Sequence, residues 1–115
     1  MIILNEQQMW DAVTLEDIMS AVEKAYEIHK SGAYYMPDRF IAARDKDLMM
    51  YMPCFTDEMI GTKMLAEFPD NPSRGLAYLN GLMLLNDAET GLPKAVMNGS
   101  AITAMRTGGA GGVAL

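Results

Sequence analysis

The chain has 115 residues, of which 50% are hydrophobic and 21% are charged, and 15 acidic against 9 basic residues give a formal net charge of −6. This length allows a single domain, and the composition is typical of a folded globular protein rather than a disordered chain. The sequence has no apolar run of about 18 residues, and its Lys and Arg residues are scattered along an acidic chain. We therefore expect neither a membrane nor a nucleic acid among its partners.

Cysteine and histidine are scarce, with one residue of each type, Cys54 and His29. A single cysteine cannot form an internal disulfide bond, which is typical of proteins from reducing compartments. The start of the chain, Met1–Asn5, is too short and lacks the basic residues that a targeting segment needs. These features predict a cytoplasmic protein without a metal site.

Residues 14–31 have the clearest helical pattern. Thr14 and Asp17 are spaced as a capping box, with Asp in place of the usual Glu or Gln, and Gly32 provides a C-terminal stop. Between them, apolar residues recur on one face of the predicted helix, and His29 lies on or beside that face. We expect this histidine to be packed or partly exposed rather than catalytic.

Five segments after Pro37 have the composition of strands, namely 39–43, 48–52, 59–68, 76–85 and 94–97. The charged break at 44–47 is typical of a hairpin turn, and the breaks at 54–58, 69–75 and 86–93 are predicted loops. Cys54 therefore falls in a loop, and no basic neighbour in sequence activates its thiol. In the third segment, alternation places Lys63 on the same face as Leu65 and opposite Thr62 and Met64.

The last segment is predicted to be a helix of small residues that begins with Ser100 as its N-cap. Gly109–Ala114 matches the loose dinucleotide fingerprint GxGxxA, but that fingerprint requires a preceding strand, whereas here the start of a helix precedes it. We interpret the glycines as sites of close helix packing. The sequence stops at Leu115 inside this expected helix and without a cap, so we expect a fragment of a longer protein.

Three cations stand out because apolar or small residues surround them. They are Arg39, Lys63 in the middle of a predicted strand, and Arg106, the only charge after Lys94. Each one is either a solvated or ion-paired side chain or a ligand for an anion. Together they are of the types that bind a small carboxylate, because Arg offers a two-pronged donor and Lys a point charge.

Several motifs together resemble the ornithine cyclodeaminase/mu-crystallin family. They are Gly61-Thr-Lys63, Phe68–Pro72, Gly91-Leu-Pro93 and Ile102-Thr-Ala-Met-Arg-Thr-Gly108, with Met49–Pro53 similar to an apolar strand of the family that ends in Met-Pro. The resemblance runs in order from the first helix to Leu115.

This resemblance implies an α+β domain over residues 1–115, with an N-terminal helix, a mixed and largely antiparallel sheet and a closing C-terminal helix. In the family this substrate-binding and dimerisation domain precedes a Rossmann domain that binds NAD or NADP, and sheets of two subunits pack together. We expect this sequence to stop shortly before that Rossmann domain. We therefore expect a homodimer through the sheet face, and neither stable cofactor binding nor catalysis by this chain alone.

The resemblance also implies roles for individual residues. Arg39, Lys63 and Arg106 match positions that bind the substrate carboxylate, Lys63 also lies near the reacting carbon, and Thr107 matches a position close to the phosphates of the nucleotide. One departure concerns Met50, which stands where cyclodeaminases carry a glutamate. Methionine cannot transfer the protons that ring closure of ornithine requires.

Two classes of function therefore remain. The first is an NAD(P)-dependent amino-acid dehydrogenase or imine/ketimine reductase, of which this chain is the substrate-binding part, acting on a small amino acid, a 2-oxo acid or a cyclic imine. The second is a stand-alone module that dimerises or binds a small acid without catalysis. Ornithine cyclodeaminase activity is disfavoured by Met50.

Overall fold

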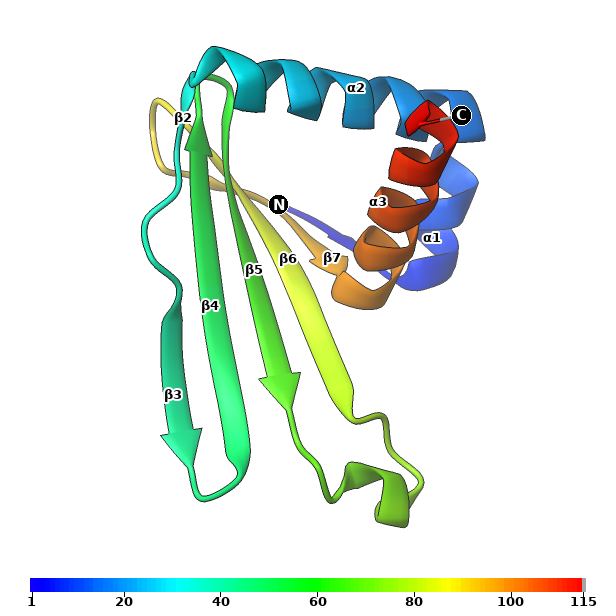
Figure 1. Cartoon of the computed structure of the whole chain (residues 1–115), viewed down its shortest axis with the longest axis vertical. Coiled ribbons are helices and arrows are strands. Elements are labelled where there is room, and N and C mark those ends of the chain that lie inside the picture. Colours follow the sequence, from blue (N-terminus) through cyan, green and yellow to red (C-terminus); the bar gives the residue numbers. More distant parts are fainter. Residues whose placement is uncertain (115) are drawn as a thin grey trace.

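The chain folds into a seven-stranded mixed sheet with three helices on one of its faces (Figure 1). The computed structural model describes residues 1–114, and the predicted helix end at Leu115 lies outside the described residues. The elements are β1 (Ile2–Leu4), α1 (Glu6–Ala12), α2 (Leu15–Ser31), β2 (Tyr34–Tyr35), β3 (Phe40–Arg44), β4 (Asp47–Thr56), β5 (Met59–Glu67), a 3₁₀ turn η1 (Asn71–Arg74), β6 (Leu79–Asp87), β7 (Pro93–Asn98) and α3 (Gly99–Ala114). The α+β class predicted from the sequence is confirmed.

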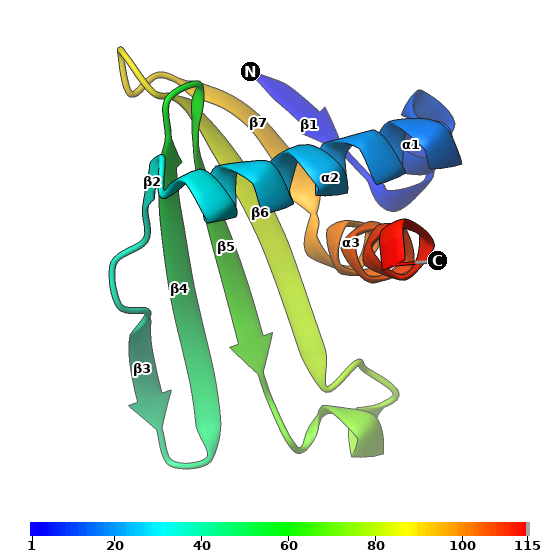
Figure 2. The ribbon, with the colours of Figure 1, turned by 45° about the horizontal axis from the view of Figure 1, so that its top comes forward.

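The sheet is almost entirely antiparallel. Its strand order is β1-β7-β6-β5-β4-β2, β3 also pairs with β4, and the one parallel pair is β1 with β7. β5 therefore lies in the interior of the sheet, between β4 and β6. Figure 2 shows α2 crossing in front of the upper part of the sheet, with α3 beside it.

Helix α2 has the predicted capping box. The hydroxyl of Thr14 accepts a hydrogen bond from the backbone N–H of Asp17 at 3.1 Å, and the Asp17 carboxylate accepts one from the N–H of Thr14 at 2.8 Å. The hydrogen bond from the Thr14 backbone N–H, followed by the effect of the Thr14 side chain, lowers the pKa of Asp17 because it stabilises the ionised carboxylate. Gly32 ends the helix in the left-handed conformation, with φ 74°, as predicted.

Three short elements at the start of the chain were not predicted, namely β1, α1 and β2. Their two to seven residues are too few for a period to be recognised. Only the capping box of α1 leaves a signal, because Asn5 and Gln8 exchange side-chain to backbone hydrogen bonds. The helix places Met9 among the few buried apolar side chains.

Strand β4 is longer than predicted, and Cys54 lies in this strand rather than in a loop. Pro53 pairs with Thr62 on the β5 edge of β4. On the opposite edge of β4, β3 pairs as far as Tyr51 and β2 pairs from Phe55 onward, so no strand lies opposite Pro53. The N–H that proline lacks is therefore not needed on that edge. The hairpin turn predicted at 44–47 is confirmed, since β3 ends at Arg44 and β4 begins at Asp47.

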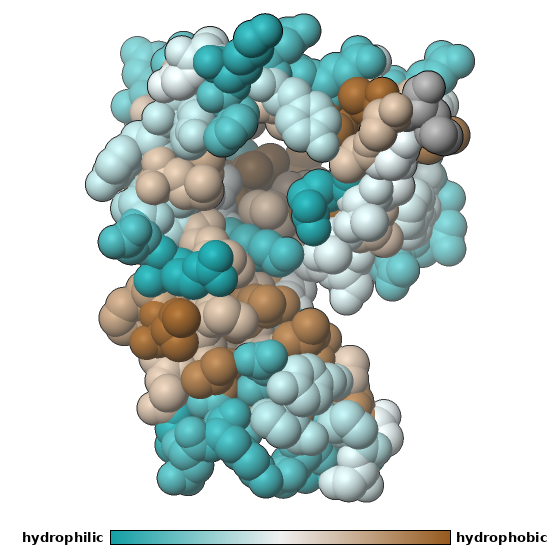
Figure 3. All heavy atoms as spheres, in the orientation of Figure 1, coloured by the Kyte–Doolittle hydropathy of each residue, from teal (hydrophilic) through white to brown (hydrophobic). Residues whose placement is uncertain are grey.

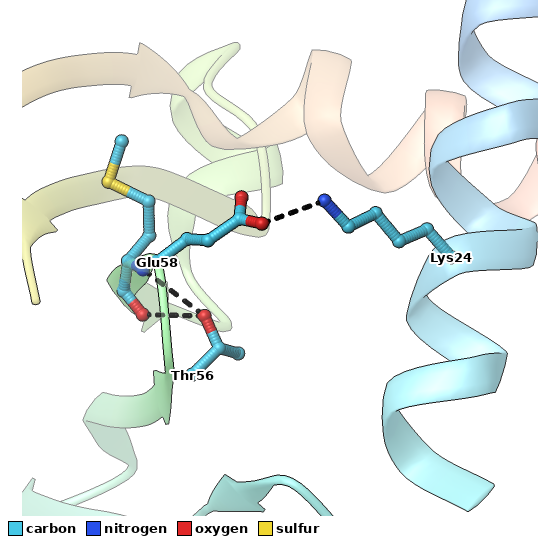
Figure 4. Close-up of polar contacts among 4 residues, drawn as sticks. Lys24, Thr56 and Glu58 are labelled. Atoms are coloured by element: carbon cyan, nitrogen blue, oxygen red, sulfur yellow. Dashed lines mark hydrogen bonds and ion pairs between the residues drawn. The ribbon is translucent and has the colours of Figure 1, made fainter. Parts of the chain in front are cut away.

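The turn from β4 to β5 is closed by Thr56, whose hydroxyl donates to the Met59 carbonyl at 2.9 Å and accepts from the Met59 N–H at 3.2 Å (Figure 4). Beside it, Lys24 of α2 forms an ion pair with Glu58 at 3.1 Å. Both charged side chains are largely exposed, so this pair contributes little to stability.

Strand β6 begins at Leu79, three residues after the predicted start at Leu76. The carbonyl of Ala77 accepts hydrogen bonds from the side-chain amides of Asn71 and Asn80, which hold this stretch in a loop conformation. The predicted strand start rested on the apolar residues after Gly75, and these residues give no sign of the asparagine hydrogen bonds to Ala77.

Helix α3 begins at Gly99, so Ser100 is not its N-cap. Instead, the side-chain oxygen of Asn98, the last residue of β7, accepts a hydrogen bond from the backbone N–H of Ala101 at 2.9 Å. Asn is among the best N-cap residues because its short side chain reaches these free N–H groups.

The sheet has one covered and one open face. On the open face, cross-strand neighbours include Phe40, Tyr51, Met64 and Leu82 in one row across four strands. The chain exposes 7983 Å², whereas a compact monomer of 12.6 kDa exposes about 6,200 Å² and so roughly 1,800 Å² less. This excess is about twice the roughly 800 Å² that each partner buries in a standard protein interface.

Replacing Asn98 with Ala should lower the free energy of unfolding by about 1 kcal/mol, because the first turn of α3 loses its side-chain acceptor. Ser100→Ala, within the first turn of the same helix, should change it by much less. Urea unfolding of both variants measures the difference. Equal effects of the two substitutions would contradict the assignment of Asn98 as the cap.

Candidate functional site

Lys63 lies near the middle of β5 and points to the face of the sheet that carries the helices. Its cross-strand neighbours on that face are Met52 of β4 and Met83 of β6. The side chain is half-buried, and neither neighbouring thioether offers it a strong hydrogen-bond acceptor. Lys63 is not at an edge of the sheet, because β5 is an interior strand between β4 and β6.

The Lys63 ammonium instead donates a hydrogen bond to the hydroxyl of Thr103 on α3, with 3.2 Å between Nζ and Oγ1. Thr103 lies one helical turn after Gly99, so both residues occupy the stripe of α3 that faces β5 and β6. The contact joins two parts of the chain that are 40 residues apart in sequence.

The approach of α3 to the sheet depends on two glycines. A Cβ added at Gly99 would lie 2.5 Å from the carbonyl carbon of Gly81, and a Cβ added at Gly81 would lie 2.8 Å from the backbone oxygen of Met64. No side chain fits in either place without a backbone shift. Glycines on both sides therefore allow the start of α3 to lie against β6, close enough for Thr103 to reach Lys63.

An open hollow of about 480 Å³ lies against this contact. Lys63 is the only charged residue among those that line it, and the polar groups beside it are the hydroxyls of Ser100, Thr103 and Thr107. The remaining lining is small or apolar, with Leu65, Leu79, Gly81, Gly99 and Ala104. Figure 3 shows the helical face of the sheet hollowed below α2 and beside α3, with hydrophilic groups around the hollow.

Arg106 lies on the same helix but lines a different hollow, of about 280 Å³, between α2 and α3. At about 100° per residue, it projects roughly 60° away from Thr103, between the stripe that faces the sheet and the stripe that faces α2. Asp17 of α2 lines this second hollow too, but its carboxylate accepts hydrogen bonds from its own capping box. The guanidinium of Arg106 is exposed.

Arg39 is exposed and lies one residue before β3. The pairing of β3 with β4 ends at Phe40–Tyr51, so Arg39 lies just outside the ladder. β3 and β5 are separated by β4, and strands lie about 4.8 Å apart, so the backbones of Arg39 and Lys63 are roughly 10 Å or more apart. The two residues therefore do not touch.

Within residues 1–114, none of the three predicted cations forms an ion pair with a carboxylate, since the ion pairs there involve Lys24, Arg44 and Lys46. The structure therefore brings Lys63 and α3 together, places Arg106 on the adjoining side of that helix and leaves Arg39 two strands away. Sequence reasoning missed Thr103, whose contact with Lys63 only the tertiary fold creates.

Met50 and Thr107 are also positioned on this side of the molecule. Met50 pairs with Leu65 of β5 and Ile41 of β3, so it lies on the helical face in apolar surroundings. Thr107 is exposed and follows Thr103 by one helical turn along the same stripe of α3.

The glycine-rich segment Gly109–Ala114 is helical and does not form a phosphate-binding turn. Gly109 lies against Ile18 and Val22 of α2, where an added Cβ would come within 2.8 Å of each side chain, and Gly112 lies against Met19. The prediction of close helix packing is confirmed for Gly109 and Gly112, but it is wrong for Gly111, where an added Cβ would meet open space.

Other kinds of site find no support in the part of the chain that the structure describes. No group of three or more His, Cys, Asp or Glu side chains there could hold a metal ion. Over the same residues, no helix is both long and apolar enough to cross a membrane. His29 is exposed and shares a hydrogen bond of 2.9 Å with the hydroxyl of Tyr34.

The strand order, with α3 packed against β5 and β6, is that of an α+β domain. The model of the ornithine cyclodeaminase/mu-crystallin family matches residues 1–115, and the chain belongs to this family. The family includes NAD(P)-dependent amino-acid dehydrogenases and imine reductases.

Two relatives are similar along nearly the whole chain. Alanine dehydrogenase from Archaeoglobus fulgidus is 34% identical over 113 residues, which are 98% of this chain and 35% of that protein. A Δ¹-pyrroline-2-carboxylate reductase from Bacillus thuringiensis subsp. konkukian is 27% identical over 118 residues, which are 99% of this chain and 36% of that protein. The chain thus spans about a third of the length of these relatives.

Solved structures agree in fold. An archaeal alanine dehydrogenase dimer with bound NAD superposes with a TM-score of 0.86 at 34% identity, over 96% of this chain and 35% of that chain. The Δ¹-pyrroline-2-carboxylate reductase of Thermococcus litoralis, in complex with NADH and L-proline, superposes with a TM-score of 0.86 at 34% identity. The match covers 99% of this chain and 36% of that chain.

Replacing Gly99 with Ala should lower the free energy of unfolding by about 1–3 kcal/mol, because the new methyl group meets the backbone of Gly81. Gly111→Ala, on the same helix but with open space at the Cβ position, should leave stability unchanged or raise it by up to about 1 kcal/mol. Chemical denaturation of both variants tests this difference. If Gly99→Ala is as stable as Gly111→Ala, the close contact of α3 with β6 is not required.

Proposed function

We propose that this chain is the substrate-binding and dimerisation part of an NAD(P)-dependent amino-acid dehydrogenase or imine/ketimine reductase, with Lys63 at its centre. The observation that carries the proposal is Lys63 itself, an interior lysine without an acidic partner in residues 1–114 and held beside a hollow that no acidic residue lines. A half-buried cation in that position favours an anion as its partner.

A carboxylate is the anion that the relatives' chemistry suggests. Alanine and proline, which appear in the names of the similar proteins, are both α-amino acids with a carboxylate beside the carbon that exchanges hydride. Lys63 would bind this carboxylate as a point charge, and Arg39 and Arg106 would approach it from the start of β3, two strands away, and from α3. Fixing the carboxylate orients the α-carbon, which accounts for a large part of catalysis in such reactions.

The nicotinamide cofactor, when bound, supplies or accepts the hydride. Residues 1–114 would contribute only a small part of the cofactor-binding site, because their glycine-rich segment is a packed helix and not a dinucleotide-binding turn. Thr107 is the residue here that would contact the nucleotide, because its exposed hydroxyl lies on the stripe of α3 that continues from Thr103. Lys63 would also help to move a proton near the reacting carbon.

Met50 favours reduction of an imine or a 2-oxo acid over ornithine cyclodeamination. Its side chain lies on the helical face of β4 in an apolar setting and has no group that transfers protons. The substrate class that fits is therefore a small amino acid and its 2-oxo acid, or a cyclic imine.

The open sheet face would form a homodimer. The row from Phe40 to Leu82 is apolar, and 65% of Phe40 and 41% of Leu82 are exposed. A monomeric protein seldom leaves so large an apolar area uncovered. The same face would serve the alternative function, a stand-alone module that dimerises or binds a small acid without catalysis.

Lys63→Met in the parent enzyme should lower kcat/KM at least about 100-fold, because the substrate carboxylate loses its central cation. Lys30→Met, an exposed lysine in the last turn of α2, is the matched control and should leave the kinetics unchanged. Oxidation of NADH or NADPH with 2-oxo acids plus ammonia, or with cyclic imines, measures the rates. Unchanged kinetics in Lys63→Met would overturn the assignment.

Met64→Glu should convert the dimer to a monomer, because it places a charge in the centre of the open face. Lys30→Glu introduces the same side chain far from that face and should leave the dimer intact. Light scattering coupled to size exclusion at high micromolar concentration gives the mass of each. A wild-type protein that is strictly monomeric under these conditions contradicts the proposed interface.

A further inference from the structure

We propose that Thr103 is a positioning residue that holds the ammonium of Lys63 in its productive orientation; this inference rests on the proposed function. The starting observation is the hydrogen bond from Lys63 Nζ to Thr103 Oγ1 at 3.2 Å. It is the one side-chain hydrogen bond that the structure gives Lys63 among residues 1–114. The cross-strand neighbours of Lys63, Met52 and Met83, offer its ammonium no strong hydrogen-bond acceptor.

A lysine in such surroundings needs an anchor. Its side chain has four rotatable bonds and loses rotamer entropy when it is fixed in one conformation. Flexible thioethers on both sides restrain it weakly. Without Thr103, the ammonium would sample several positions over the hollow, and few of them would suit one carboxylate geometry.

Thr103 suits this role because the start of α3, which carries it, is held in place by two contacts. The start of α3 is held by the Asn98 cap and by the contact between Gly99 and Gly81, one helical turn before Thr103. A β-branched side chain in a helix also has few rotamers. The Thr103 oxygen is therefore a rigid acceptor above a flexible donor.

The hydrogen-bond capacity of the two groups leaves room for a substrate. An ammonium has three donors, and one of them is used by Thr103, so two remain for a carboxylate in the hollow. The Thr103 hydroxyl accepts from Lys63 and keeps its own proton to donate. Substrate binding thus does not require the contact between Lys63 and Thr103 to break.

The test compares Thr103→Val, which keeps the shape but removes the hydroxyl, with Thr103→Ser, which keeps the hydroxyl. In the parent enzyme, Thr103→Val should lower kcat/KM for the carboxylic substrate about 10-fold and leave KM for the nicotinamide cofactor unchanged. Thr103→Ser should stay within about threefold of wild type on the same scale. Thr103→Ala serves as a second variant without the hydroxyl, should the valine impair folding.

A double-mutant cycle with Lys63→Met separates positioning from a general structural role. If Thr103 acts through Lys63, adding Thr103→Val to Lys63→Met should have no further effect on turnover. An undiminished effect in that background, or wild-type kinetics of both hydroxyl-free variants, would overturn the inference while leaving the proposed function intact. Wild-type kinetics of Lys63→Met would instead overturn the proposed function, and this inference with it.

A spectroscopic readout is independent of turnover. In protein labelled with ¹³C-lysine, pyruvate as the probe should shift the Cε signal of Lys63, which is assigned by its absence in Lys63→Met. The shift at saturation should persist in Thr103→Ser and be reduced in Thr103→Val. Equal shifts in the two variants contradict the role of the hydroxyl.

Discussion

The contact between Gly81 and Gly99 is the constraint on which the candidate site depends. Two backbones meet there so closely that a Cβ at Gly99 would lie 2.5 Å from Gly81. The contact sets the start of α3 against β6, and the helical rise then carries Thr103 over Lys63 and Thr107 to the end of the same hollow. Gly109, later in α3, likewise allows close packing, because it lies against Ile18 and Val22 of α2. Small residues thus determine where the functional side chains lie.

The distribution of apolar surface supports the proposed homodimer. The helices gather at one end of the sheet, and α2 and α3 pack on each other through glycine (Figures 1 and 2). Only Met9, Ala95 and Ala101 are buried apolar side chains among residues 1–114. Many other apolar side chains are only half-buried in the single chain. Association through the open face, as proposed above, would bury more of this apolar surface.

The sequence predicted the elements with strong local signals and missed those without them. The Thr14–Asp17 capping box, the Gly32 stop and the hairpin around Asp45 were recognisable because local chemistry determines them. The limits of β4 and β6 were wrong because the register with β5 and two asparagine hydrogen bonds to Ala77 decide them. Lys63, Arg106 and Arg39 stood out as isolated charges, but Thr103 could not, because a threonine inside a helix becomes notable only when the fold brings Lys63 to it.

A crystal structure of the protein with bound pyruvate and an oxidised nicotinamide cofactor tests the central claim most directly. Our account predicts a carboxylate oxygen within about 2.7–3.2 Å of Lys63 Nζ, with Thr103 still bonded to the same nitrogen. It also predicts that the keto carbon faces the nicotinamide. A carboxylate bound away from Lys63, with the lysine in contact only with protein atoms, would contradict the account.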